Sequence, residues 1–93
     1  MIRSFRSKPT ERLFHRERVK EFAQIAMVAR RRLVTLDGAH RLQDLLIPPS
    51  NRLEALQGDR AGQYSIRIND QYRICFAWKE GDAYAVEITK HYR

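Results

Sequence analysis

Two arginines, Arg67 and Arg73, flank a short polar loop in the second half of the chain. Apolar residues on both sides of this loop alternate with period two, which predicts two antiparallel strands. If the apolar residues face one side of a sheet, Ile66 lies opposite Ile74, and Arg67 lies opposite Arg73 on the other side. Like charges so placed destabilise a sheet, and an anion between them removes the penalty. Guanidinium groups bind phosphate through paired hydrogen bonds, so the pattern predicts a phosphate site.

The last hairpin is expected to bring further side chains to this face. The same pairing rule joins Phe76 to Val86 and Ile74 to Ile88. The side chains then placed beside the arginines are Cys75, Glu87, Thr89 and, if the strand continues, His91. RNA is cut when its 2′-hydroxyl attacks the adjacent phosphorus, and an enzyme assists with a base, an acid and cations. The face therefore favours metal-independent RNA cleavage.

Each candidate residue has a role in this chemistry. Arg73 is the candidate for stabilising the pentavalent phosphorane, and Arg67 and Arg60 are further phosphate contacts. His91 is the candidate proton carrier, because an imidazole titrates near neutrality. Tyr92 could stack on a base or orient a phosphate. The alternative is that the arginines are surface charges paired with Glu87, Glu54 or Asp70, and that the chain end frays.

No metal or other cofactor is expected. The three histidines, His15, His40 and His91, are scattered along the chain without the spacing of metal ligands. The chemistry must then come from side chains alone.

The elements that would position these residues form an α+β pattern with helices on one face of a sheet. Residues 2–5 predict a short opening strand, and Ser7, Pro9 and Thr10 predict the start of a short helix. An apolar stripe from Phe22 to Leu36 predicts the main helix, which Asp37-Gly38 can end. Asp37 could also cap a short helix carrying Leu42, Leu45 and Leu46, which Pro48-Pro49 would end. After a connecting segment at 47–62, three strands are expected at about 63–68, 72–78 and 83–89, as a meander. The apolar sides of these strands are expected to carry Tyr64, Ile66, Ile68; Tyr72, Ile74, Phe76, Trp78; and Tyr84, Val86, Ile88.

The composition fits one basic domain of 93 residues with net charge +7. Residues 1–50 carry 11 Lys/Arg against 5 Asp/Glu, a net charge of +6, and residues 51–93 carry 7 against 6, a net charge of +1. Such a surplus favours a polyanionic partner. No stretch resembles a membrane span or a signal peptide, and the single cysteine forms no internal disulfide. The expected compartment is the cytoplasm.

The second half of the chain resembles the HigB family of the RelE/ParE toxin superfamily. The resemblance rests on residues 51–56 (NRLEAL), 58–62 (GDRAG) and 64–76 (YSIRINDQYRICF), followed by 81–84 (GDAY) and 86–88 (VEI). The opening residues 1–5 (MIRSF) are similar to the start of the family. The combined string is specific, whereas each piece alone would be weak.

This resemblance implies a microbial-ribonuclease-like fold and ribosome-dependent cleavage of mRNA in the decoding site. It also implies a HigA-like helix-turn-helix antitoxin as partner, which contacts DNA so that the complex represses its own operon. It carries over Arg73 as the transition-state arginine, and Arg67 and Asn69 as RNA contacts. Gln57 and Lys90 complete the candidate RNA-binding set.

Two positions depart from the family pattern. Family members often carry a basic residue where this chain has Gln57, and often end in Asp-Tyr-His where this chain has Lys90, His91 and Tyr92. The swapped order of His and Tyr reverses which side of a strand each would face. Weakened cleavage is the hypothesis that follows.

Three rival interpretations remain. One is a relative that binds RNA or the ribosome without cutting. Another is a ParE-like gyrase-inhibiting toxin on the same scaffold, and the third is a DNA-binding protein, although no helix-turn-helix pair is evident.

Overall fold

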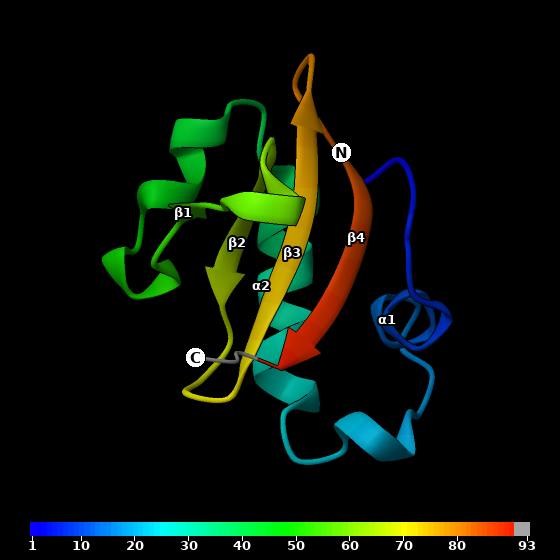
Figure 1. Ribbon diagram of the computed structural model, residues 1–93. Helices are drawn as coiled ribbons and strands as arrows, with labels where there is room; N and C mark the ends of the chain where they lie inside the picture. Colours follow the sequence, from blue (N-terminus) through cyan, green and yellow to red (C-terminus); the bar gives the residue numbers. More distant parts are fainter. Residues whose placement is uncertain (91–93) are drawn as a thin grey trace.

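The computed structural model describes residues 1–90, which form two α-helices and a four-stranded antiparallel sheet (Figure 1). The helices are α1 (Lys8–Phe14) and α2 (Ala26–Gly38), and the sheet order is β1-β2-β3-β4. The strands are β1 (Glu54–Ala55), β2 (Gln63–Arg67), β3 (Tyr72–Lys79) and β4 (Asp82–Lys90). Short 3₁₀ helices are η1 (Lys20–Phe22), η2 (Leu42–Leu46), η3 (Pro49–Asn51) and η4 (Gly58–Arg60). The α+β class, with its C-terminal meander, is as predicted.

The core lies between α2 and one face of the sheet (Figure 1). Leu33 and Leu36 of α2 are fully buried, as are Ile66, Ile74 and Phe76 of the sheet. Their spacings of three and four on the helix, and of two on the strands, give each element one apolar side. Each such burial stabilises the fold by about 1.5–3 kcal/mol. The main helix begins only at Ala26, because Phe22 belongs to the separate turn η1.

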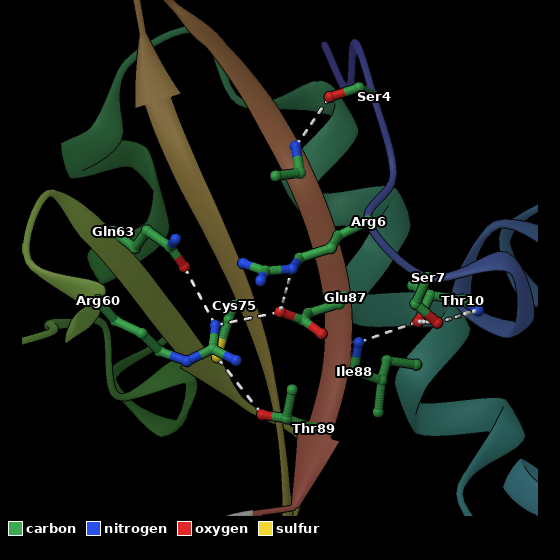
Figure 2. Close-up of polar contacts among 11 residues, drawn as sticks. Ser4, Arg6, Ser7, Thr10, Arg60, Gln63, Cys75, Glu87, Ile88 and Thr89 are labelled. Atoms are coloured by element: carbon green, nitrogen blue, oxygen red, sulfur yellow. Dashed lines mark hydrogen bonds and ion pairs between the residues drawn. The ribbon is translucent and has the colours of Figure 1, made fainter.

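Helix α1 begins as the sequence predicts and is tied to the last strand. The hydroxyl of its N-cap Ser7 accepts a hydrogen bond from the Thr10 N–H, with Pro9 in the first turn. The fully buried Thr10 hydroxyl also accepts the Ile88 N–H of β4 at 2.9 Å. This contact joins α1 to the edge of the sheet (Figure 2).

The predicted opening strand is wrong. Residues 2–5 run beside β4 in parallel but make only two isolated bridges, Ile2 to Ala83 and Phe5 to Val86. Between them Ala85 has a left-handed φ of 54°, and its N–H donates to the Ser4 hydroxyl instead of a main-chain carbonyl. This bulge breaks the ladder before a strand can form.

The same bulge corrects the predicted side of Tyr84. The β3–β4 register shifts between Cys75 and Ala77, so Tyr84 pairs with Ala77 and Ala83 pairs with Trp78. Ala83, rather than Tyr84, is therefore fully buried. The predicted pairing of Phe76 with Val86 falls within this irregularity, whereas Ile74 pairs with Ile88 as expected.

The segment 47–62 is more structured than a simple connection. It contains β1, which pairs with β2 through Glu54–Ser65 and Ala55–Tyr64, and the turns η3 and η4. The preceding turn η2 is not capped by Asp37. The Asp44 carboxylate accepts the Arg41 and His40 N–H groups instead, and these hydrogen bonds hold the pKa of Asp44 below its ordinary value. Within residues 1–90, no helix has the length and apolar character to cross a membrane.

Candidate nucleic-acid interface

The β2–β3 hairpin places Arg67 directly opposite Arg73, as predicted. Ile66 pairs with Ile74 on the core side, and the Ile68 N–H donates to the Tyr72 carbonyl at 3.0 Å. The side-chain oxygen of Asn69 accepts the Gln71 and Tyr72 N–H groups at 2.8 Å each, which stabilises the three-residue loop. The odd loop length keeps both arginines on the face turned away from α2.

A row of three paired residues lies next to the arginines on this face. Ser65 pairs with Cys75, and Cys75 pairs with Glu87, so these residues form a row across three strands. The Cys75 Sγ lies 3.5 Å from the Thr89 hydroxyl (Figure 2). The Ser65 hydroxyl is fully buried and has no hydrogen-bond partner among residues 1–90. This row forms a floor below the longer arginine side chains.

Both hairpin arginines pair with carboxylates, which was the alternative considered for them. Arg73 Nη2 lies 2.9 Å from Glu54 Oε1, and Arg67 pairs with Asp70. The carboxylate side chains are 53% and 91% exposed, and ion pairs with exposed partners contribute only about 0–1 kcal/mol. A phosphate that offers two acceptor oxygens can therefore replace them.

A second cluster of charges lies around Glu87, whose side chain is only 15% exposed. Arg60 of η4 donates from Nη1 to Glu87 Oε2 at 3.1 Å and to Gln63 Oε1 at 3.2 Å. The Arg6 Nε lies 3.7 Å from the same Glu87 oxygen (Figure 2). Three segments distant in sequence thus meet on this face.

The remaining candidates are more dispersed. Gln57 is exposed at the N-cap of η4, and its side chain caps nothing. Asn69 lines a cavity of about 400 Å³ next to η1, together with Lys20, Gln24 and Tyr72. Lys90 pairs with Tyr72 and lies 6.0 Å from its ring, on the side opposite Arg73. His91 and Tyr92 lie outside the described residues.

The sequence interpretation missed Arg6 as a member of this face. Its position depends on the N-terminal segment running parallel to β4, which no local pattern indicates. Glu87 was expected on the face, but only as one of several carboxylates. Within residues 1–90, no group of three His, Cys, Asp or Glu side chains is placed to hold a metal ion.

The fold is that of a known toxin–antitoxin structure. The chain superposes on the YoeB–YefM complex from Staphylococcus aureus with a TM-score of 0.61 over 99% of each chain, at 19% sequence identity. The protein therefore has a small α+β fold of the YoeB/RelE-like type. A family model described as "RelE-like toxin of type II toxin-antitoxin system HigB" matches residues 3–92. The chain belongs to this family of HigB-like toxins.

Two curated relatives match this chain, and one of them carries the name of the family. The chain is 46% identical over 61 residues to "Toxin HigB-1" of Vibrio cholerae, which covers 66% of this chain and 64% of that protein. It is 31% identical over 64 residues to an uncharacterized protein of Haemophilus influenzae, which covers 69% of this chain and 63% of that protein. The match thus spans less than two thirds of either relative's length.

Proposed function

We propose that this protein is a ribosome-dependent endoribonuclease that cuts mRNA without a metal. The observation that carries the proposal is the register that sets Arg67 opposite Arg73 on the face away from α2. Two guanidinium groups carried by directly paired strand residues can share one phosphate. Membership of the HigB-like toxin family supports the same activity.

In the proposed reaction, the ribose 2′-oxygen attacks the adjacent phosphorus while a base takes its proton. The bond to the 5′-oxygen breaks, and this oxygen leaves with a proton, giving a 2′,3′-cyclic phosphate and a 5′-hydroxyl. Arg73 donates hydrogen bonds to the phosphoryl oxygens as negative charge builds on them. Arg67, Arg60 and Asn69 hold the RNA.

The proton carrier is proposed to be His91, with Tyr92 stacking on a base or orienting a phosphate. Both come just after Lys90 in the sequence, and Lys90 is the last residue of β4. Gln57, near Arg60 in the chain, is proposed as a peripheral RNA contact, weaker than a basic residue because it has no charge.

We also propose a helix-turn-helix antitoxin as partner, in the cytoplasm. An acidic segment of such a partner would suit a chain of net charge +7, whose first 50 residues hold most of the surplus. The fold's likeness to a chain from a toxin–antitoxin complex agrees with this partnership.

The test is primer extension on mRNA from cells that express the protein. Wild type should give discrete cuts and growth arrest, and Arg73→Ala should reduce cleavage by about 10²–10³-fold, as loss of a transition-state donor does elsewhere. Arg31→Ala is the matched control, because Arg31 is exposed on α2, which packs against the opposite face of the sheet. Undiminished cuts with Arg73→Ala, or no cuts with wild type, would reject the proposal.

A second candidate is a relative that binds RNA on the ribosome without cutting it. The pairing of Arg73 with Glu54 favours it, because the nearby carboxylate weakens the positive charge that Arg73 would offer to a transition state, while the other arginines can still bind RNA. Growth arrest with intact mRNA would select this alternative.

A further inference from the structure

We infer that Glu87 is a positioning residue that builds, with Arg60 and Arg6, a second phosphate-binding site beside the Arg67–Arg73 pair. The inference rests on the proposed RNA-binding function and deepens it. It adds a subsite, with its own residues, to the face that the hairpin provides.

The first support is that Glu87 of β4 contacts two other segments that are distant from it in sequence. Arg60 comes from η4, and Arg6 from the N-terminal segment, where its backbone N–H also donates to the Val86 carbonyl at 3.0 Å. Both guanidinium groups approach the same oxygen, Glu87 Oε2, at 3.1 and 3.7 Å (Figure 2). Without this carboxylate the two cations would repel each other and separate.

The second support is the set of donors left free. An arginine carries five N–H donors. Arg60 uses Nη1 for Glu87 and Gln63, and Arg6 approaches Glu87 through Nε. The other donors of both groups have no partner within residues 1–90. The Arg6 and Arg60 side chains are 59% and 37% exposed, so a ligand can reach these donors. Both arginines can therefore bind a phosphate without leaving Glu87, and the cluster keeps a net charge of +1.

The third support is distance from the hairpin pair. Glu87 lies opposite Cys75, two residues along β3 from Arg73. Two residues of a strand span about 7 Å. A single RNA strand lying across the sheet can contact both clusters through different phosphates.

A competing explanation is that Glu87 masks the arginines and repels RNA. The two explanations predict opposite signs when the charge is removed. Masking predicts that Glu87→Gln binds RNA more tightly, because the net charge rises by one. Positioning predicts weaker binding, because Arg60 and Arg6 lose the group that holds them together.

The experiment measures binding of a fluorescent, fully 2′-O-methylated 12-nucleotide RNA, which cannot be cut, over a range of salt concentrations. Glu80→Gln is the control, because Glu80 is exposed in the β3–β4 turn, makes no ion pair within residues 1–90, and loses the same charge. Glu87→Gln should bind about tenfold more weakly than Glu80→Gln. Arg6→Ala should reduce the slope of log affinity against log salt by about 0.7, the loss of one phosphate contact.

Binding by Glu87→Gln as tight as by Glu80→Gln, or absence of salt-dependent binding by wild type, would overturn the inference. If Glu87→Gln unfolds, Arg6→Ala alone decides, since Arg6 is exposed, and an unchanged salt slope is then the overturning result. Failure of the proposed function looks different. It appears as uncut mRNA with wild type, whatever the oligonucleotide shows.

Discussion

The Arg73 side chain is held by a carboxylate that solvent also reaches. Arg73 itself is only 14% exposed, whereas its partner Glu54 is 53% exposed and comes from the two-residue strand β1. Neighbouring residues therefore cover most of the Arg73 side chain, and Glu54 is its hydrogen-bond partner within residues 1–90. Glu54 can turn toward water when a phosphate arrives.

Glu54→Gln should therefore leave cleavage within a few-fold of wild type and lower the free energy of unfolding by less than about 1 kcal/mol. Affinity for RNA should rise, because a negative charge beside Arg73 is removed. Primer extension and urea denaturation measure the two effects. A loss of cleavage as large as that of Arg73→Ala would contradict this and place Glu54 in the reaction itself.

At the residue scale, the sequence predicted correctly which face of the sheet these side chains occupy. It did not predict which residue each of them contacts. The side occupied by Arg67, Arg73 and Glu87 follows from strand alternation, which is a local property. The choice of Glu54, rather than another acid, as partner of Arg73 depends on β1. That strand has two residues, too few to show any periodicity.

Among the elements, α1 depends on one buried hydroxyl. Thr10→Val should lower the free energy of unfolding by about 1–3 kcal/mol, because the Ile88 N–H would stay buried without an acceptor. Urea denaturation measures the change. Thr35→Val is the control, since its hydroxyl only donates to the Arg31 carbonyl on an exposed surface, and it should cost less than about 0.5 kcal/mol. Equal decreases in the free energy of unfolding for the two variants would show that the hydrogen bond to Ile88 does not contribute to stability.

Asp82 adds a charged contact to the main-chain bonds that hold the N-terminal segment beside β4. The Arg3 side chain donates to the Asp82 carboxylate at 3.1 Å, and this hydrogen bond, with the adjacent chain N-terminus, lowers the pKa of Asp82 in the folded protein. Because the folded pKa is the lower one, the stabilisation is present above the ordinary Asp pKa of about 3.9 and is lost as pH falls through the folded value.

Wild type should accordingly melt at a higher temperature than Asp82→Asn above about pH 5, and the difference should shrink below about pH 4. Thermal melts from pH 3 to 7 test this. A difference that stays constant across the range would mean that the ion pair does not link this segment to pH.

The elements also show why the opening strand could not be foreseen correctly. Residues 2–5 do lie beside β4, and their alternation is that of a strand. The interruption comes from β4, where Ala85 adopts a left-handed φ. Nothing in the sequence around an alanine predicts this conformation. The main helix and the meander were predictable because each carries its own apolar period.

For the whole molecule, most of the positive charge and the candidate RNA-binding residues lie in different halves of the chain. The fold brings part of that charge to the candidate site. The first 50 residues hold a net charge of +6, whereas the hairpin arginines lie in a half with a net charge of +1. The cations of the first half can attract RNA over a distance. Arg6 then brings a part of that surplus directly onto the face that β2, β3 and β4 provide. The distribution was readable from the sequence, but this junction required the tertiary structure.

The only thiol in the chain lies under this face, and it gives a way to follow its opening. Cys75 is 3% exposed, in the row between Ser65 and Glu87, so an alkylating reagent can reach its sulfur only while the covering side chains are displaced. The labelling rate of the unmodified protein therefore reports how often the side chains that cover Cys75 move aside. An RNA oligonucleotide bound across this face would lower the alkylation rate of Cys75.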